Sequence, residues 1–489
     1  MLMNVCDFLL ENSATLEKEA VVGRESISYP GLSARVMSVA GAFRQKHGEN
    51  NYVLILSENS TFLITVYLAL MKSGNIVVPL NPAIETENLG KVLEKTGSTI
   101  AFISKRYQSR FAGYNFTVYD QESTEAWFTS ASAGKSYLPE KEFDDRRIAE
   151  IIFTSGSTGE QKGVMITHRN IIANTESIIE YLKLTQTDII EVVMPFYYCY
   201  GLSLLHTHLR VGGAVHMNNA FIFVGSVIDD LNKYNCTGFA GVPSHYQILL
   251  RKTKDFKNTA FHSLRYVTQA GGKLHNAFIE EFTDAFPGIK FYVMYGQTEA
   301  TARLSYLPPE VLPEKIGSLG KGIPGVTLLV AGEDGNPVKP GETGEILARG
   351  DNIMAGYFND PATTAATIVD GWLHTGDMAT VDDDGYIFLQ SRAKEIIKVR
   401  GIRISPKEIE AVIVTYPGVI DCTISAINDD ITGEAIKATV YVNETELDQF
   451  SGEAIRQYCA ANLASYKVPQ LVEFETKLSF NAAGKKSKY

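Results

Sequence analysis

The feature that most constrains the fold of this chain is an alternation of short apolar runs with longer amphipathic segments in its first half. Residues 60–73 carry an apolar helical pattern that ends at Gly74, the residue type usually found just past a helix end. A second, polar-faced helix is predicted at 85–95, and the runs that separate the helices are YVLILS at 52–57, IVV at 76–78 and TIAFI at 99–103. Because a strand–helix–strand alternation implies parallel pairing, we expect an α/β fold with a parallel sheet.

The alternation continues through the middle of the chain and then stops. A strand is predicted at 148–154, and Thr167 or Asn170 can cap a helix that runs to about Leu182. A strand, a helix and another strand follow at 264–268, 274–286 and 291–294. From about residue 316, short strands with the turn signals Asp334-Gly335-Asn336 and Asp383-Asp384-Gly385 predict an antiparallel β region.

Beyond Arg392 the pattern predicts a compact α+β unit of about a hundred residues, large enough to be a domain. Ser405-Pro406 opens a helix in this unit, strands are expected near 419–426 and 435–442, and another helix starts at Ser451. We therefore predict an N-terminal domain over 1–391, with a β-rich subdomain at about 316–391, and a small C-terminal domain over 392–489.

Composition and charge exclude several classes of protein. With 489 residues, 45% hydrophobic and 21% charged, the chain has an ordinary globular mix. Its net charge of −11 argues against a general nucleic-acid binder. The five cysteines form no CxxC pair, and the N-terminus lacks a signal-peptide pattern. No apolar run is long enough to cross a bilayer, so we expect a cytoplasmic protein without an integral membrane segment.

The strongest chemical signal is the loop TSGSTGEQKG at 154–163, which follows a predicted strand. Glycines let a backbone approach an anion closely, hydroxyls and amides donate to its oxygens, and Lys162 adds charge. The spacing is not that of a Walker A loop, which would need Gly at 161 and Ser or Thr at 163. A flexible Gly/Ser turn is the alternative. The candidate phosphate-binding residues are Thr154, Ser155, Gly156, Ser157, Thr158, Gly159 and Lys162.

Two more loops directly follow predicted strands: one contains Gly271 and Gly272, and the other is Tyr295-Gly296-Gln297-Thr298-Glu299. At the carboxyl edge of a parallel sheet, both would lie beside the 154–163 loop, where open α/β sheets bind ligands. Tyr295 can lie against a nucleobase and Thr298 can donate to a phosphate. Glu299 suits Mg²⁺, which prefers carboxylate and phosphate oxygens. An exposed turn with an ordinary helix cap is the alternative for this segment.

Three segments give weaker signals. Asp377, which ends GWLHTGD at 371–377, is placed like an acidic residue that binds ribose hydroxyls. The stretch from Arg392 to Lys407 has six basic residues and one acidic residue, a candidate surface for a polyanion such as coenzyme A. Most charge runs are solvated faces, which is the alternative here. Lys485 lies on a glycine turn in NAAGKK at 481–486, and such tails are often frayed.

Taken in order, these segments resemble the adenylate-forming superfamily of acyl- and aryl-CoA synthetases, peptide-synthetase adenylation domains and beetle luciferases. The resemblance covers nearly the whole chain and is closest to AMP-forming acyl-CoA synthetases. The segments that carry it are LALMKSGNIVVPLNP (68–82), FTSGSTGEQKGVMITHRN (153–170), YGQTE (295–299), GEILARGDNIMAGYFND (344–360), GWLHTGD (371–377), SRAKEIIKVRGIRISPKEIE (391–410) and NAAGKK (481–486).

The resemblance implies a function and a set of roles. The enzyme would adenylate a carboxylic acid with ATP and Mg²⁺, and then transfer the acyl group to the thiol of CoA with release of AMP and pyrophosphate. Catalysis would fall to Lys485, Thr298 and Glu299, and the small domain would be mobile. The other implied roles are adenine stacking by Tyr295, ribose binding by Asp377 and Arg392, Mg²⁺ binding by Glu299 and Thr158, a hinge at Lys394, and a CoA face at Lys398, Gly401 and Arg403.

The acyl pocket departs from the family pattern. Many CoA synthetases read Pro-x-x-His-x-x-Gly where this chain has Pro195 to Gly201, with Tyr198 at the histidine position and Cys199 beside it. No Asp lies between Met194 and Arg210, which disfavours a standard amino acid as substrate. Gly296 stands where acetate-type enzymes have a tryptophan, so an acid larger than acetate should fit. The tyrosines favour an apolar or aromatic lining, and a plain packing role for them stays open.

Only four residues follow Lys485, so we expect no carrier-domain serine motif after it. The final acceptor is then either free CoA or a separate acyl carrier protein, and the sequence does not separate the two. A non-catalytic nucleotide-binding relative is a third hypothesis, disfavoured because Lys485, Glu299, Asp377 and the phosphate loop are all present. A monomer and a homodimer are both open.

Overall fold

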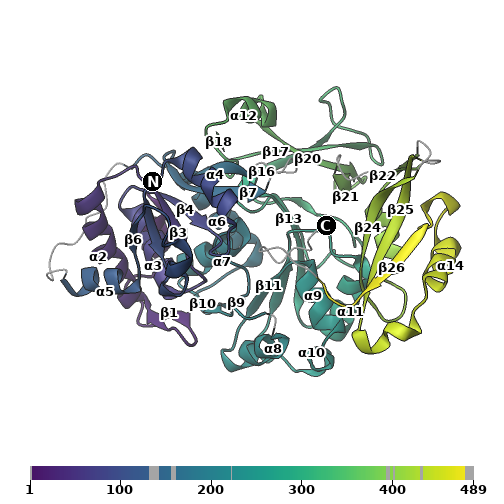
Figure 1. The fold of residues 1–489 in the computed structure, drawn as a ribbon, viewed down its shortest axis with the longest axis horizontal. Helices are drawn as coiled ribbons and strands as arrows, with labels where there is room; N and C mark the ends of the chain where they lie inside the picture. Colours follow the sequence, from purple (N-terminus) through teal and green to yellow (C-terminus); the bar gives the residue numbers. More distant parts are fainter. Residues whose placement is uncertain are drawn as a thin grey trace.

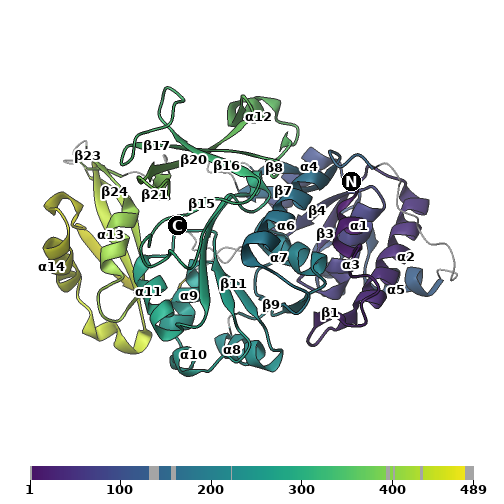
Figure 2. The same ribbon diagram turned by 180° about the vertical axis from the view of Figure 1, so that it is seen from behind.

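In the computed structural model, the described residues are 3–130, 143–155, 161–221, 223–392, 397–399, 402–429 and 433–478. These residues form two large sheets, an antiparallel β-rich sheet and a small sheet near the C-terminus. Figures 1 and 2 show the N-terminal part at one end of the long axis and the small C-terminal unit at the other. The β-rich sheet lies along the upper edge of both views.

The seven-stranded sheet has the order β18-β8-β7-β4-β3-β5-β6. Its strands from β7 to β6 are parallel, while β8 and β18 add an antiparallel edge. The bounds are β3 (Tyr52–Leu56), β4 (Ile76–Leu80), β5 (Ile100–Ile103), β6 (Thr117–Tyr119), β7 (Ile148–Ser155), β8 (Gln161–Thr167) and β18 (Gly356–Tyr357).

The nine-stranded sheet has the order β15-β14-β13-β12-β11-β9-β10-β1-β2. The strands from β13 to β1 are parallel, and β14, β15 and β2 are antiparallel at the two edges. The bounds are β1 (Glu19–Val22), β2 (Ile27–Ser28), β9 (Ile189–Val192), β10 (Ala214–Met217), β11 (Gly238–Gly241), β12 (Tyr266–Gln269), β13 (Lys290–Tyr295), β14 (Ser305–Leu307) and β15 (Lys321–Gly322).

Helices pack on both large sheets, and one apolar core joins the sheets. This core contains Ile152 of the seven-stranded sheet, Val192 of the nine-stranded sheet and the buried faces of α1, α3, α6 and α7. The helices of this part are α1 (Val5–Leu10), α2 (Tyr29–His47), α3 (Thr61–Lys72), α4 (Thr86–Thr96), α5 (Gln121–Ser130), α6 (His168–Leu182), α7 (Cys199–Arg210), α8 (Val224–Lys233), α9 (Pro243–Arg251), α10 (Lys254–Asn258) and α11 (Asn276–Ala285), with a 3₁₀ turn, η1, at Lys105–Phe111.

The local signals for helix ends act as expected. Helix α3 begins after Ser60, whose side chain accepts a hydrogen bond from the Leu63 N–H, and Gly74 beyond its end has a φ of +75°. Thr167 caps α6, and Asn170 completes a reciprocal capping box, so both candidate caps take part. The apolar face of each helix then docks on a sheet.

The β-rich sheet has the order β16-β17-β20-β19, with β21 paired to β20. All its pairs are antiparallel. It begins at Val326, whereas β15 upstream belongs to the nine-stranded sheet. The bounds are β16 (Val326–Ala331), β17 (Thr343–Gly350), β19 (Ile368–Val369), β20 (Trp372–Val381), β21 (Ile387–Arg392) and α12 (Pro361–Thr367).

The C-terminal unit has a sheet of order β23-β22-β25-β24, with β26 parallel to β25. Its apolar side is continuous with the core around α9 and α11, because Ile409 and Val419 belong to the same cluster as Leu249 and Phe278. The bounds are β22 (Ile397–Val399), β23 (Ile402–Ile404), α13 (Pro406–Ile413), β24 (Val419–Asp429), β25 (Gly433–Val442), α14 (Gly452–Asn462) and β26 (Leu471–Glu475), with 3₁₀ turns η3 (Glu444–Gln449) and η4 (Ser465–Lys467).

The predicted fold class is confirmed: parallel-sheet α/β layers, a β-rich part and a small α+β domain. The sequence reasoning missed β8, however, and ran the 154–163 loop directly into the helix. Within the described residues, no helix combines the length and the apolar character needed to span a bilayer.

Candidate functional site

The phosphate-loop candidates lie at the tip of a β-hairpin. Strands β7 and β8 pair antiparallel, with Thr154 opposite Lys162 and Ser155 opposite Gln161. Residues 156–160 form the connection and lie outside the described residues, so Gly156, Ser157, Thr158 and Gly159 are not placed. Lys162 extends its ammonium over the ring of Tyr357, 4.9 Å from the ring centroid.

Tyr357 links this hairpin to the YGQTE segment. Strand β18, which carries Tyr357, pairs with β8, and the Tyr357 hydroxyl donates a 2.8 Å hydrogen bond to Oε1 of Glu299. Glu299 lies in a 3₁₀ turn, η2 (Thr298–Ala300), which follows β13 of the other large sheet. The two predicted loops therefore converge, but from two different sheets rather than along the edge of one. Burial raises the pKa of the Tyr357 phenol, and the Glu299 carboxylate raises it further.

The backbone after η2 is held in an uncommon conformation. Thr301 has a φ of +64°, a region that β-branched residues rarely adopt. Its hydroxyl donates to the Asn352 carbonyl at 2.7 Å, and the Asn352 amide donates to the carbonyl of Arg303 at 2.8 Å. The Met354 N–H also donates to the Glu299 carbonyl at 2.9 Å. These bonds fix the turn that presents Thr298 and Glu299.

Neither Tyr357 nor Asn352 was singled out by the sequence reasoning. Both lie in the segment 344–360, which carried the family resemblance without a role for any residue. Only the tertiary structure reveals their roles, because their hydrogen-bond partners are more than 45 residues away in the chain.

The adenine and ribose candidates meet at the junction of the nine-stranded and β-rich sheets. Tyr295 ends β13, and its hydroxyl donates a buried 2.7 Å hydrogen bond to Oδ2 of Asp377 on β20. In the β20–β21 register, Asp377 is paired with Arg392, the other ribose candidate, so the backbones of these two residues lie side by side. Gly376, with a φ of +72°, makes the bend that precedes Asp377.

The Gly271-Gly272 segment follows β12, the neighbour of β13. Gly271 has a φ of +84°, which favours glycine, and the Gln269 side chain donates to the Gly272 carbonyl at 2.7 Å. Both glycines therefore lie at the same carboxyl edge as Tyr295, as predicted.

The acyl-pocket candidates begin helix α7. Cys199 Sγ lies 3.6 Å from Thr298 Oγ1, so this helix end reaches the YGQTE turn. Tyr198 is half-buried with its ring 4.9 Å from that of Tyr197, and burial raises the pKa of Tyr198 to about 12. At Gly201, a Cβ would lie 2.2 Å from the Pro195 carbonyl oxygen, so close packing accounts for this glycine.

Gly296 also has a packing reason. A Cβ at this position would lie 2.1 Å from the Ala302 carbonyl oxygen and 2.8 Å from the Arg303 Cα. The missing side chain thus lets the chain fold back on itself after β13. Because packing alone accounts for Gly296, this glycine supports an acid larger than acetate less strongly than the sequence suggested.

The candidates of the small domain are only partly placed. Lys398 and Arg403 face each other in the β22–β23 register, as cross-strand neighbours of a short hairpin. Lys394, Gly401 and Lys485 lie outside the described residues.

The small domain rests on α9 and α11 of the large one. Gln247 donates to Oδ1 of Asp421 at 3.0 Å, and the Arg251 guanidinium donates to the carbonyl of Val414 at 2.9 Å. Burial lowers the pKa of Lys273, with the charge of Lys407 on α13 lowering it further. Attractive and repulsive contacts therefore coexist at this interface.

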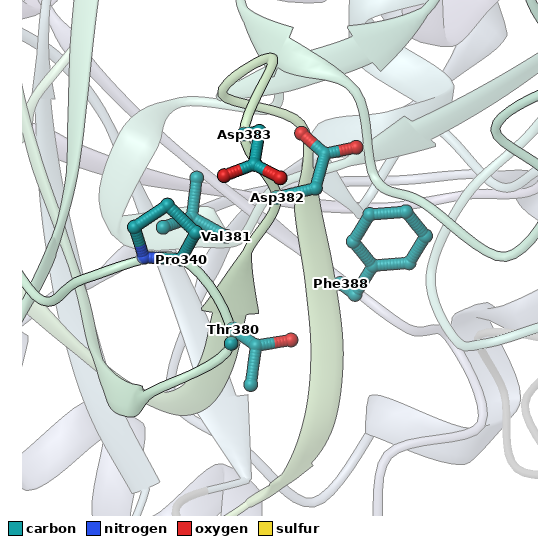
Figure 3. Close-up of a pocket in the computed structure, with 7 residues that line it drawn as sticks. Pro340, Thr380, Val381, Asp382, Asp383 and Phe388 are labelled. Carbon is teal, nitrogen blue, oxygen red and sulfur yellow. The ribbon is translucent and has the colours of Figure 1, made fainter.

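A separate shallow hollow of about 400 Å³ lies on the β-rich sheet, near the turn between β20 and β21. Figure 3 shows the lining residues Asp382 and Asp383 above Thr380, with Pro340 on one side and Phe388 on the other. It includes none of the predicted site residues. We therefore place the candidate site at the meeting point of β8, η2, β18 and β20.

Comparison with protein families gives two matches that together cover most of the chain. The profile of the AMP-binding enzyme family matches residues 10–358, and that of the AMP-binding enzyme C-terminal domain matches residues 408–485.

Individual relatives match along nearly their whole length. A feruloyl-CoA synthase of Amycolatopsis is 30% identical over 473 residues, covering 95% of this chain and 93% of the relative. An oxalate–CoA ligase of Arabidopsis thaliana is 30% identical over 469 residues, covering 93% and 89%. Among solved structures, the o-succinylbenzoate CoA synthetase of Bacillus subtilis, in complex with its acyl-adenylate intermediate, superposes with a TM-score of 0.85 at 25% identity, covering 99% of this chain and 96% of that one.

Proposed function

Because this chain belongs to the AMP-binding enzyme family, we propose that it is an AMP-forming acyl-CoA synthetase. It would join a carboxylic acid to the α-phosphate of ATP, releasing pyrophosphate, and then transfer the acyl group to the CoA thiol, releasing AMP. The predicted reaction class, an acid–thiol ligase, is confirmed by relatives that are named as CoA ligases or synthases.

The observation that carries the proposal is the link from Lys162 through Tyr357 to Glu299. It brings a cation, a phenol and a carboxylate from two sheets to one place. In the described part of the chain, Oε2 of Glu299 has no hydrogen-bond partner, so this carboxylate fits Mg²⁺. The B. subtilis synthetase has been solved with ATP and magnesium. Bound Mg²⁺ would neutralise phosphate charge, which otherwise repels the substrate carboxylate.

The residues of this chain would divide the first step among themselves. Lys162 and the 154–159 loop would hold the phosphates, and Thr298 would donate to the α-phosphate. Tyr295 would lie against adenine, with Asp377 and Arg392 at the ribose. Lys485 would approach from the small domain and stabilise the charge that develops as pyrophosphate leaves.

The second step would use the other face of the small domain. We place the domain boundary at 391/392, with Lys394 as the hinge and Lys398, Gly401 and Arg403 at the CoA phosphates. The strand bounds support a boundary near this point but at least one residue later, since β21 ends at Arg392 in the β-rich sheet and β22 begins at Ile397 in the small-domain sheet. Rotation about the hinge would withdraw Lys485 from the site and bring the CoA face of the small domain to it.

The acid is proposed to be larger than acetate, with an apolar or aromatic body. Tyr197 and Tyr198 support this, because their half-buried rings lie at the start of α7, and Cys199 next to them reaches Thr298. The relatives are named for ferulate, oxalate and long-chain fatty acids, which differ in size and polarity. The names of the relatives therefore do not indicate which acid this chain uses.

The experiment is AMP release from ATP and Mg²⁺ across short, medium, long, aromatic and hydroxylated acids, each with and without CoA. CoA-dependent turnover on an acid larger than acetate is the expected result. Adenylation that CoA does not stimulate would instead support a separate acyl carrier protein as acceptor. Absence of adenylation with every acid would overturn the proposal.

Two finer expectations accompany it. We propose a cytoplasmic location, checked by fractionation of the source cells, and a monomer or homodimer, decided by light scattering on the purified protein.

A further inference from the structure

A second cluster of ionisable side chains lies on the nine-stranded sheet, away from the candidate site. Glu191 on β9 and His216 on β10 are register partners in a parallel pair, so their side chains project from the same face of the sheet. Asp230 on α8 covers this face. Figures 1 and 2 show α8 at the lower edge of the molecule, opposite the β-rich sheet.

Two members of the cluster are deeply buried in apolar surroundings. Glu191 is 0% exposed and His216 is 3% exposed. Ile189 and Val193, on the same face of the strand as Glu191, pack with Val227 and Leu231 of α8. An ionised carboxylate in such a place is costly unless a positive charge or hydrogen-bond donors compensate it.

The histidine presents a lone pair to the cluster. His216 Nδ1 lies 3.0 Å from the carbonyl oxygen of Val22, and because a carbonyl only accepts, Nδ1 carries the proton. In the neutral ring, Nε2 is then an acceptor. It lies 3.2 Å from Oδ2 of Asp230 and makes no hydrogen bond. A backbone carbonyl bound to the far nitrogen is the usual support of a metal-binding histidine.

The two carboxylates are likewise under-compensated. The Asn218 amide donates to Oε1 of Glu191 at a long 3.4 Å and to Oδ2 of Asp230 at 3.1 Å. Oε2 of Glu191 is buried and has no partner. Across the described part of the chain, neither carboxylate forms an ion pair with a lysine or arginine. Three potential ligand groups thus face one another, and no lysine or arginine of the described residues pairs with them.

We propose that Glu191, His216 and Asp230 bind one divalent transition-metal ion of the zinc class. The ligand atoms of the three residues lie within 4.8 Å of one another. Ligands of tetrahedral Zn²⁺ lie roughly 3.4 Å apart, so small side-chain rotations would close the site. One imidazole nitrogen with two carboxylates suits Zn²⁺ better than Mg²⁺, which prefers oxygen ligands. The ion would tie α8 to β9 and β10.

Entry to the site is available through Asp230, whose side chain keeps 23% of its surface exposed. A buried polar cluster that needs no metal and a metal site make opposite predictions for zinc binding.

The test is zinc binding by the untagged full-length protein after removal of metals with a chelator. Zn²⁺ is titrated calorimetrically in the presence of excess Mg²⁺, which occupies nucleotide-type sites, and bound zinc is counted after gel filtration. We expect one equivalent in the wild type and an upward shift of the melting temperature. Glu191→Gln and Asp230→Asn should each weaken binding by about tenfold or more.

Glu150→Gln is the matched control. Glu150 is also a buried glutamate on a large sheet, but its carboxylate accepts a 2.9 Å hydrogen bond from Tyr67, so zinc binding should be unchanged. Asp230→Asn keeps the test valid if Glu191→Gln does not fold, because Asp230 is partly exposed. The proposal is overturned if the wild type binds no more zinc than Asp230→Asn, or if Glu150→Gln loses binding to the same degree.

Discussion

The adenine side of the candidate site and the docking surface of the small domain are held in different ways. On the adenine side, the Tyr295–Asp377 and Tyr357–Glu299 bonds, at 2.7 and 2.8 Å, join elements of the large domain only. At the docking surface, the 3.0 Å Gln247–Asp421 bond is accompanied by repulsion between the positive charges of Lys273 and Lys407. Within the described residues, the adenine-side bonds do not pass through the small domain. The rotation of the small domain proposed above would leave these two bonds in place.

The largest effect should come from removing the lysine assigned to the small domain. Lys485→Ala is expected to slow adenylation by roughly 10²–10³-fold, because a donor to the transition-state charge is lost. Thioester formation from a synthetic acyl adenylate should stay near the wild-type rate. Pyrophosphate release and CoA-dependent consumption of the adenylate measure the two steps, with Lys486→Ala as control. Unchanged adenylation in Lys485→Ala would refute the assignment.

The next effect concerns the Glu299 carboxylate. Glu299→Gln should weaken the apparent Mg²⁺ affinity in adenylation by about 100-fold, and Tyr357→Phe, which removes only the supporting hydrogen bond, by roughly tenfold. Titration of the adenylation rate with Mg²⁺ measures both. If Tyr357→Phe shifted the Mg²⁺ curve as far as Glu299→Gln, the phenol rather than the carboxylate would be the critical group.

A smaller change tests the adenine side directly. Tyr295→Phe keeps the ring but removes a buried donor to Asp377, so the free energy of unfolding should fall by about 1–3 kcal/mol. The KM for ATP should change little if the ring itself contacts adenine. Urea denaturation and initial rates check the two parts. Tyr292→Phe on the same strand is the control, because that hydroxyl bonds no other described residue. A large rise in KM without loss of stability would contradict the assigned role.

The smallest effect should appear at the docking surface. Gln247→Ala removes one hydrogen bond to Asp421, worth about 1 kcal/mol, or roughly fivefold in the population of this arrangement. If the small domain rotates, the ratio of the two half-reaction rates should change by about that factor. Gln457→Ala, which removes a bond within α14, should leave the ratio unchanged. An unaltered ratio in Gln247→Ala would argue against a catalytic role for this arrangement.

Much of the fold was predictable because its signals are local. The apolar run of α3, the Thr167–Asn170 capping box and Gly74 act over a few residues, and the structure uses them as expected. Strand β8 was missed because the sequence 161–167 has no clear alternation or turn signal of its own. It becomes a strand because β7 and β18 pair with it on either side.

The candidate site shows the same division. The types and order of its residues were readable, since phosphate, nucleobase and magnesium each demand particular side chains. Other features could not be read from the sequence, because each depends on a contact between distant segments: Tyr357, Asn352 and the Glu191–His216–Asp230 cluster.

The sequence by itself thus determined the types of the elements that have strong local signals, the family and the chemistry that the loops can perform. Only the tertiary structure decided that the phosphate hairpin and the YGQTE turn come from different sheets. It also decided that packing explains Gly201 and Gly296, and that two carboxylates and a histidine meet between β9, β10 and α8. The physical reason is range: caps and turns are settled by neighbours in the chain, whereas strand pairing and burial are settled by whichever distant segment covers a residue.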